Sequence, residues 1–293
     1  MNAKNANLHK AKKEANDEFY TQYEDIAKEI EHYKEHLKGK VVYCNCDIPH
    51  FSNFHKYFLD NLKELELKQL IVTGYVKNGN GKCSIYDGEK STDYDLLGDG
   101  DFRGDECVDM LQKADVIITN PPFSLFREFI KVLVDNGKGF IVVGNKNAIT
   151  YKDVFPLFMK DKMFIGATIP NDFITPSRET KKINGLSRWF TSFNVRDNEY
   201  LPNTKEYSNL GYPKYDNYNA INVDKVKDIP KDYDGVMGGP ITFLDKCNLS
   251  QFEIVGIDRY VADNPHYGRR FTLNGKEIYA RILIKRKGVV WWI

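Results

Sequence analysis

The chain has 293 residues, a length that allows two domains of ordinary size. Apolar residues make up 42% of it, enough for a sizeable core, and 42 basic against 41 acidic residues exclude a histone-like polycation and an acidic disordered tail. No apolar run approaches the roughly 18–20 residues of a membrane-spanning helix, and no secretory signal is expected from the polar first residues. Five sparsely placed cysteines favour a reduced cytoplasmic protein.

The charges are unevenly distributed along the chain. Residues 87–109 contain nine acids and two bases, whereas residues 259–293 contain eight bases and two acids. The first segment repels polyanions and the second attracts them, although ordinary solvated surface would carry the same charges.

The first part of the chain predicts alternating helices and strands. Thr21 and Glu24 form a T-x-x-E capping box, and the apolar residues behind it recur at three- and four-residue steps, which predicts a helix. A short β-branched strand at 40–44 precedes a helix capped by Ser52, and residues 70–73 form the next strand. A strand, a helix and a strand at this spacing predict a βαβ unit with a parallel sheet.

The alternation continues through residues 106–113, which predict a short helix, and 116–119, which predict a buried strand. That strand ends at Asn120-Pro121-Pro122-Phe123, because prolines cannot donate to a sheet ladder. Ser124 can cap the helix that follows. Further strands are predicted at residues 139–144, 163–168, 188–193, 241–244, 252–257 and 278–285.

A domain boundary is expected near Arg196, where the sequence becomes rich in Tyr, Asn and Lys and loses its helical periodicity. We therefore predict an α/β domain over residues 1–195, with a mostly parallel central sheet, and a smaller mixed region over residues 196–293.

The four residues Asn120 to Phe123 carry the strongest chemical signal. They stand at the carboxyl end of a predicted parallel strand, where open α/β sheets bind ligands. An amine conjugated to a ring is a poor nucleophile, and two acceptors aimed at its hydrogens localise its lone pair as the nitrogen becomes tetrahedral. The Asn120 side-chain oxygen and the Pro121 carbonyl, held by fixed proline dihedrals, can be those acceptors. Phe123 offers a ring on which a flat base can stack. A proline turn before a core Phe would give the same four letters.

Asn-Pro-Pro-Phe after a buried strand resembles the catalytic motif of S-adenosylmethionine-dependent amino-methyltransferases acting on adenine N6. With the order of its motifs, that of the gamma group, the chain resembles in particular the EcoRI-type DNA adenine modification methyltransferases. The further matching segments are Phe19-Tyr20-Thr21, Asn45-Cys46-Asp47-Ile48-Pro49, Ser52-Asn53-Phe54, Gly100-Asp101-Phe102-Arg103, Trp189-Phe190-Thr191 and Pro240 to Lys246.

The resemblance implies a Rossmann-like catalytic domain over residues 1–195 that binds S-adenosylmethionine, and a target DNA recognition region over residues 196–293. It implies direct methyl transfer to an adenine flipped out of duplex DNA, with Asn120, Pro121, Pro122 and Phe123 as the catalytic motif and with no metal. The residues that it assigns to the cofactor are Phe19, Tyr20, Thr21, Asn45, Asp47, Thr73, Asp101, Phe102 and Asn120.

Four of these cofactor residues have an expected partner group. Asp47 would meet the ammonium group or a water near it, Asp101 and Phe102 the adenine, and Thr73 the ribose. The chain departs from most methyltransferases after the first strand, where Cys44-Asn45-Cys46-Asp47 replaces the usual G-x-G. No second cysteine pair completes a tetrahedral metal site around this C-x-C.

Basic residues are expected to contact DNA phosphates, which position the duplex without reading its sequence. Trp189 is a candidate to hold the flipped base, as is Phe173. The residues expected to bind DNA are Arg178, Lys181, Lys182, Trp189, Arg269, Arg270, Lys285 and Arg286. Base readout is expected from Asn, Arg or Lys side chains between residues 196 and 270.

Alternative functions stay open on the sequence alone. A related enzyme could modify adenine in RNA, cytosine N4 or a protein glutamine, and an inactive DNA-binding protein could share the fold. For the leading interpretation, the expected partner is double-stranded DNA with a specific adenine site, bound by a monomer in the cytoplasm of a bacterium or of a phage-infected cell. No membrane is involved, and a restriction endonuclease acting separately is compatible with this interpretation.

Overall fold

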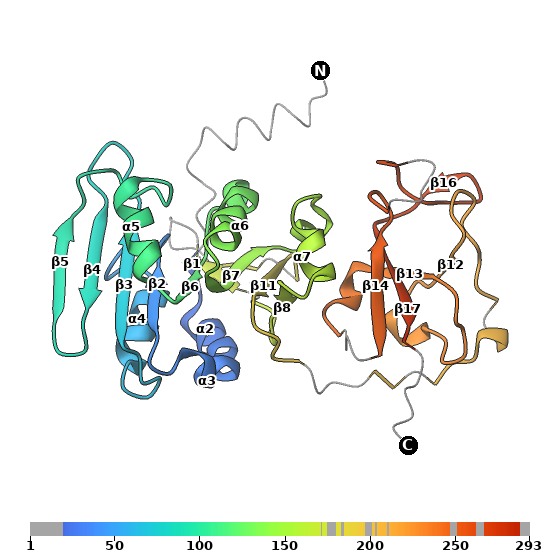
Figure 1. Ribbon diagram of the computed structural model, residues 1–293, viewed down its shortest axis with the longest axis horizontal. Coiled ribbons are helices and arrows are strands. Elements are labelled where there is room, and N and C mark those ends of the chain that lie inside the picture. Colours follow the sequence, from blue (N-terminus) through green and yellow to red (C-terminus); the bar gives the residue numbers. More distant parts are fainter. Residues whose placement is uncertain are drawn as a thin grey trace. The chain divides into compact units, whose positions relative to one another are not determined.

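The computed structural model describes residues 20–170, 172–174, 180–182, 185–196, 201–202, 204–209, 211–246, 251–261 and 267–287. The chain divides into two compact units, one of Met1–Ala148 with Ile165–Val195 and one of Ile149–Phe164 with Arg196–Ile293 (Figure 1). The second unit thus takes in residues 149–164, which were expected in the first domain.

An eight-stranded mixed sheet forms the centre of the first unit, in the order β5-β4-β3-β2-β6-β7-β11-β8. The four middle strands β3, β2, β6 and β7 are parallel, whereas β4, β5 and β11 pair antiparallel to their neighbours. The expected α/β fold is therefore confirmed. The strands are β2 (Val41–Cys44), β3 (Gln69–Gly74), β4 (Lys82–Tyr86), β5 (Ser91–Asp95), β6 (Val116–Thr119), β7 (Gly139–Asn145), β8 (Phe164–Ile165) and β11 (Ser187–Thr191).

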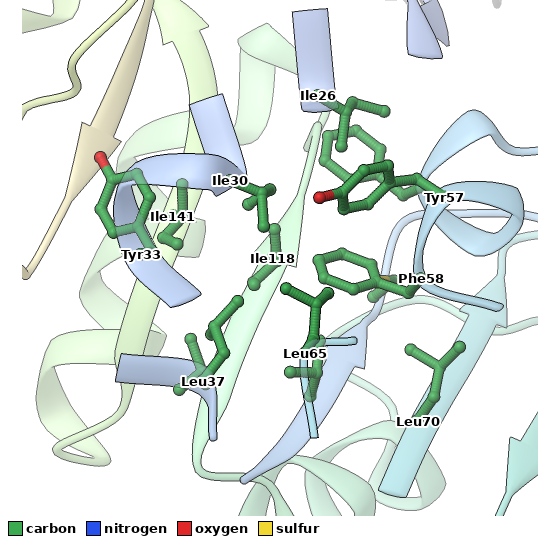
Figure 2. Close-up of a cluster of buried hydrophobic side chains, with 14 of the residues drawn as sticks. Ile26, Ile30, Tyr33, Leu37, Tyr57, Phe58, Leu65, Leu70, Ile118 and Ile141 are labelled. Carbon is green, nitrogen blue, oxygen red and sulfur yellow. The ribbon is translucent and has the colours of Figure 1, made fainter. Parts of the chain in front are cut away.

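Helices cover both faces of this sheet, and apolar residues at helical spacing hold them there. On one face, α2, α3 and α4 pack onto alternate residues of β2, β3, β6 and β7 (Figure 2). On the other face, Phe126 at the start of α6 contacts the ring of Phe190, and Phe129 contacts that of Phe102. The helices are α2 (Tyr23–Ile30), α3 (Lys34–Leu37), α4 (Asn53–Asn61), α5 (Asp105–Lys113) and α6 (Phe126–Asp135).

One charged residue lies on the buried face of α2. The Glu29 carboxylate is fully buried and accepts hydrogen bonds from the Tyr33 hydroxyl, from the Ala167 backbone N–H and from both the N–H and the hydroxyl of Thr168, at 2.6–2.9 Å. Gly166 lies so close that a Cβ there would be 2.1 Å from a Glu29 oxygen. Glu29 therefore fixes the segment after β8 to α2, because so many donors around a buried carboxylate leave it no other satisfied position.

Of the three helix caps that the sequence predicts, at Thr21, Ser52 and Ser124, the structure has one. Ser52 caps α4 as expected, because its hydroxyl accepts from the Phe54 N–H at 3.0 Å. The capping box at Thr21 is wrong: Thr21 belongs to the short strand β1 (Tyr20–Thr21), and α2 begins at Tyr23 without a side-chain cap. Ser124 does not cap α6 either, since it lies inside the 3₁₀-helix η2 (Phe123–Leu125) that precedes this helix.

The second unit is built on a smaller four-stranded sheet in the order β12-β13-β17-β14. Residues 241–244, predicted as a strand, instead form a 3₁₀-helix, η6 (Ile241–Phe243). The described strands of this unit are β12 (Ile221–Asn222), β13 (Met237–Pro240), β14 (Phe252–Ile257), β15 (Thr272–Leu273), β16 (Lys276–Glu277) and β17 (Arg281–Arg286); its helices are α7 (Phe155–Met159) and the 3₁₀-helices η4 (Tyr207–Asn209) and η5 (Val226–Asp228).

A third sheet, of three short strands in the order β1-β9-β10, belongs to the first unit. In it, β1 pairs antiparallel with β9 (Asp172–Ile174), which pairs antiparallel with β10 (Thr180–Lys182). Two further 3₁₀-helices are η1 (Glu31–Tyr33) and η3 (Lys146–Thr150). Within the residues that the structure describes, no helix has the length and apolar character needed to cross a membrane.

Candidate active site

The candidate site lies where the direction of the sheet connections reverses. From β2 the chain passes through α4 to β3 on one side, and β6 lies against β2 on the other side, with Tyr43 paired to Ile117. From the carboxyl ends of the adjacent parallel strands β2 and β6, the chain continues in opposite directions along the sheet. Doubly wound sheets bind ligands at such a point. Asn45 follows β2 and Asn120 follows β6, so the topology brings the two expected segments to one place.

The motif after β6 is held by its own backbone and by the core. Pro121 is buried, and Asn120 and Phe123 are half-buried. Phe123 packs against the cluster beneath α2 and α4, and η2 leads directly from it into α6. The two prolines remove backbone freedom between the strand and this packed ring. Asn120 and Phe123 thus flank a stiff segment at the strand end.

Asp47 connects the loop after β2 with the strand before Asn120. Its carboxylate is 5% exposed, with one oxygen 2.5 Å from the Ser52 hydroxyl and the other 2.5 Å from the Thr119 hydroxyl. Its backbone N–H donates to the Thr73 carbonyl at 2.9 Å. Burial raises the pKa of Asp47 to about 6, although the two hydroxyl hydrogen bonds oppose this shift. Residues from β3, β6 and α4 therefore meet at one buried carboxylate.

Two residues expected to bind the cofactor carry buried oxygens without a partner. Asn45 is 3% exposed and Thr21 is 2% exposed. Within the described residues, neither the Asn45 side-chain oxygen nor the Thr21 hydroxyl has a hydrogen-bond partner. Such groups are costly when buried alone and are usually satisfied by a ligand or water. Both positions therefore fit a bound polar molecule.

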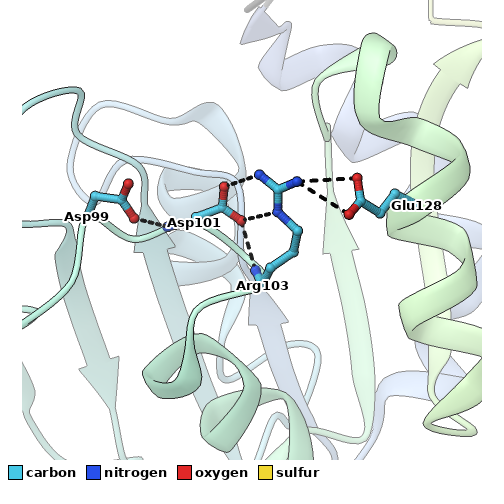
Figure 3. Close-up of polar contacts among 4 residues, drawn as sticks. All are labelled: Asp99, Asp101, Arg103 and Glu128. Carbon is cyan, nitrogen blue, oxygen red and sulfur yellow. Dashed lines mark hydrogen bonds and ion pairs between the residues drawn. The ribbon is translucent and has the colours of Figure 1, made fainter.

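Asp101 is held by a neighbouring arginine (Figure 3). The Arg103 guanidinium binds both carboxylate oxygens, at 2.8 and 2.5 Å, and also contacts Glu128 on α6 at 3.3 Å. Arg103 holds the pKa of Asp101 below its ordinary value, so the group stays an ionised acceptor. The turn that carries it needs glycine, because Gly100 has φ +84° and a Cβ there would lie 2.4 Å from the Gly74 carbonyl oxygen.

Three expected site residues are instead absorbed by packing. The Thr73 hydroxyl is fully buried and hydrogen-bonds the Tyr43 hydroxyl at 2.8 Å, which leaves it no exposed surface for the expected contact with a ribose. Trp189 is fully buried on β11 and packs edge-on against Phe54, which leaves no exposed part of its ring for the expected contact with a flipped base. Phe102 is 4% exposed and packs against Phe129, which leaves little of its ring for an adenine.

The residues expected to bind DNA fall into two groups in the second unit. Arg269 and Lys285 are exposed. Arg270 forms an ion pair with the buried Asp258 at 3.2 Å, and Arg286 donates to the Pro230 carbonyl at 2.9 Å and lies 5.2 Å from the centre of the Phe252 ring. The contacts of Arg270 and Arg286 mean that these two side chains have structural partners whether or not they reach a phosphate.

Five other expected residues can be placed only partly or not at all. Phe19 and Arg178 lie outside the described residues, and only the backbones of Tyr20 in β1 and of Lys181 and Lys182 in β10 are described. Since β9 lies between β1 and β10, the segment expected to bind the cofactor shares a sheet with one expected to bind DNA.

Sequence reasoning missed three positions that organise the site, namely Thr119, Asn53 and Arg103. Thr119 was read only as the end of a strand, Asn53 only as part of a matching segment, and Arg103 only as the end of another. No spacing rule predicts their contacts. Thr119 and Asn53 contact residues that are distant in sequence, and Arg103 contacts Asp101 within its own turn. Glu29 did carry a signal, since it stands among the apolar positions of a predicted helix.

The raised pKa of Asp47 predicts a dependence of stability on pH. Below its native pKa of about 6 and above its ordinary 3.8, the native protein holds a proton that the unfolded chain has lost. The free energy of unfolding should therefore fall as pH rises through this window, by up to about 3 kcal/mol. Asp47→Asn stays neutral, so the stability of wild type minus that of the variant should fall between pH 4 and 7 and stay level above. Urea unfolding of both proteins measures this difference, and a rise or a flat line across that window would contradict it.

The chain also matches known proteins along almost its whole length. Residues 7–96 and 76–287 match the family described as "Adenine-specific methyltransferase EcoRI". The chain is 44% identical to the type II methyltransferase M.EcoRI of Escherichia coli, over 98% of each protein. It is 34% identical to M.MpnI of Mycoplasma pneumoniae, over 96% of this chain and 98% of the relative. No solved structure matches the chain significantly.

The similarity to M.MgeORF184P of Mycoplasma genitalium is of the same order, at 34% identity over 96% of this chain and 99% of the relative. These matches extend through both units and include the strand-end motif at Asn120. The chain therefore belongs to the EcoRI family of adenine-specific methyltransferases, as its motifs predict.

Proposed function

We propose that this methyltransferase transfers the methyl group of S-adenosylmethionine to the N6 amine of a flipped-out adenine at a specific site in duplex DNA. The observation that carries the proposal is the position of Asn120-Pro121-Pro122-Phe123, at the carboxyl end of β6 and beside the loop after β2. Doubly wound sheets bind ligands where the strand connections reverse, and this motif follows β6 at that point of the sheet.

The residues around this place fit S-adenosylmethionine, which would supply a methyl group already activated on its sulfonium. The unpartnered oxygens of Thr21 and Asn45 can accept from its ammonium group or its hydroxyls. The ionised Asp101 can accept from its adenine amine or its ribose. Tyr20 and Phe19 complete the proposed set through the segment that contains Thr21, together with Asp47 in the loop after β2.

The chain's own residues prepare the adenine amine for attack. The Asn120 oxygen and the Pro121 carbonyl accept hydrogen bonds from its two N–H groups, which localises the lone pair and stabilises the positive charge that develops on the nitrogen. Stacking on the exposed part of Phe123 contributes about 1–3 kcal/mol, which offsets much of the few kcal/mol needed to flip the base. After transfer, the amine releases one proton to water.

The second unit is proposed to bind and read the DNA. Arg269 and Lys285 are the described residues of the expected set whose side chains are exposed there, so they are the best candidates for phosphate contacts. Lys181 and Lys182 of β10, in the first unit, are proposed as further phosphate contacts, in the sheet that also contains β1. We further propose that the protein is a monomer and that a restriction endonuclease acts separately on the same site. A location in the cytoplasm is supported by the free thiols of Cys44, Cys46, Cys83 and Cys107.

Replacing Asn120 with Ala tests the catalytic proposal. The variant should lose about 10²–10³-fold in single-turnover methyl transfer, because one charge-stabilising acceptor is removed. It should still gain thermal stability from S-adenosylmethionine, because binding to the native state stabilises it by mass action. Transfer of a radioactive methyl group to DNA and a melting curve measure the two quantities. Turnover above half that of wild type would refute the assignment of Asn120.

A pair of charge variants tests the proposed DNA surface. With Arg269 and Lys285 both changed to Ala, cognate and random duplexes should lose affinity by similar factors, and the log–log dependence of affinity on salt should flatten by about 1.8. Arg270→Ala is the control, because it removes the ion pair between Arg270 and the buried Asp258. This variant should lower the stability of the protein clearly and change the salt slope little. Fluorescence anisotropy at several salt concentrations measures affinity. An unchanged slope in the double variant would remove both residues from the DNA surface.

A further inference from the structure

Three segments that are far apart in sequence are joined by a short series of hydrogen bonds. The Thr119 hydroxyl donates to one oxygen of Asp47, and the Ser52 hydroxyl donates to the other. Next to Ser52, the side-chain amide of Asn53 donates to the Thr21 carbonyl at 2.8 Å. The series therefore runs from β1, through the start of α4, to the last residue of β6.

Three of the four members, Ser52, Thr119 and Asp47, are held in place by a second contact. Ser52 also caps α4 by accepting from the Phe54 N–H, so its hydroxyl cannot turn away without cost. Thr119 is fully buried at the end of a paired strand, and its β-branched side chain has few rotamers. The Asp47 backbone is bound to β3 through the Thr73 carbonyl. The series is thus stiff from Ser52 through Asp47 to Thr119.

The ends of the series are the two places where methyl transfer needs accuracy. Thr119 directly precedes Asn120, which is proposed to hold the adenine amine. Thr21 belongs to the segment proposed to hold the cofactor. Methyl transfer requires the sulfonium, the methyl group and the amine to be in line, and a displacement of about 1 Å at a reacting centre can cost on the order of 10²-fold in rate.

We propose that Asp47, Ser52, Asn53 and Thr119 form a positioning bridge that sets the cofactor segment and the loop after β2 in register with Asn120. The bridge rests on the proposed function of Asn120, and it acts through Asn120 and Thr21 without itself touching the adenine. It gives a physical role to the segment Ser52-Asn53-Phe54, which the sequence showed only as a matching stretch. It gives a second role to Asp47, which is expected near the ammonium group of the cofactor.

The bridge has an energetic signature in the structure. A buried carboxylate with an elevated pKa is more costly to place than an apolar side chain of similar size. The neighbouring thiols add no second negative charge beside it, because burial raises the pKa of both Cys44 and Cys46 well above the ordinary value and keeps them neutral. The two hydroxyls are the groups that satisfy the carboxylate, so its geometry is set by Ser52 and Thr119.

The test compares two replacements of Thr119 that differ in whether the hydroxyl remains. Thr119→Val keeps the shape and removes the hydroxyl, and Thr119→Ser keeps the hydroxyl and removes the methyl group. Single-turnover methyl transfer, the dissociation constant of S-adenosylmethionine and the melting temperature are measured for both, well below the melting temperature of either. Thr119→Val should be about 10- to 100-fold slower than wild type, and Thr119→Ser should be within about threefold of it.

A double variant separates positioning from independent packing effects. If Thr119 acts through Asp47, adding Thr119→Val to Asp47→Asn should slow transfer by no more than about threefold beyond Asp47→Asn alone. The bridge is overturned if Thr119→Val keeps a near-normal rate, if Thr119→Ser is as slow as Thr119→Val, or if the effects of Asp47→Asn and Thr119→Val simply multiply.

Asn120→Ala distinguishes failure of the bridge from failure of the proposed function. A slow Asn120→Ala variant beside a normal Thr119→Val variant would refute the bridge and leave the catalytic assignment standing. An active Asn120→Ala variant would refute the proposed function, and with it the bridge that depends on Asn120.

Discussion

The carboxyl ends of β2 and β6 lie side by side because the chain connects β2 to β3 on one side and places β6 on the other. Asp47 spans these two ends with one carboxylate, bound by a hydroxyl from each direction. A parallel sheet alone would fix the strands and leave the loops after them free to vary. The buried carboxylate removes that freedom at the proposed meeting point of cofactor and substrate, so the proposed site depends on it.

The other parts of the site support this junction in different ways. The segment Gly98 to Asp101 crosses the end of β3 so closely that Gly100 admits no side chain. Arg103 binds Asp101 and also Glu128 of α6, so it connects this segment to α6. On the buried face of α2, the Glu29 carboxylate accepts hydrogen bonds from the backbone N–H groups of the segment after β8. The site is thus assembled from buried or paired charges, and such groups favour one arrangement strongly because every alternative leaves one of them unsatisfied.

The central strands and the motif between them could be predicted because their signal is local. Residues 116–119 and 252–257 form strands with the predicted bounds, since each is a short run rich in β-branched residues ended by polar residues, glycine or proline. The hairpin of β4 and β5 was missed, because β5 is exposed along its whole length and its acidic sequence has no apolar alternation. The run at 241–244 has a strand-like composition, but its first three residues form the 3₁₀-helix η6 immediately after β13 ends at Pro240.

Side-chain roles were harder to predict than elements, for a physical reason. Thr73 and Trp189 are both expected in the site, but the sequence does not say which side chains of a strand face the core, and packing buries both. Arg270 and Arg269 are adjacent and equally basic, yet one side chain is paired to a buried carboxylate and the other is exposed. Asp47 is the converse case, because a residue expected only near the cofactor proves to join two strands.

The most direct test of this account is to identify the nucleoside that receives the methyl group. Purified protein, S-adenosylmethionine labelled in its methyl group and duplex DNA lacking N6-methyladenine would be incubated and the DNA digested to nucleosides. The account predicts that the label appears in N6-methyldeoxyadenosine and that sequencing places it within one DNA word. Label in N4-methyldeoxycytidine, or only in RNA or protein supplied in parallel, would contradict it.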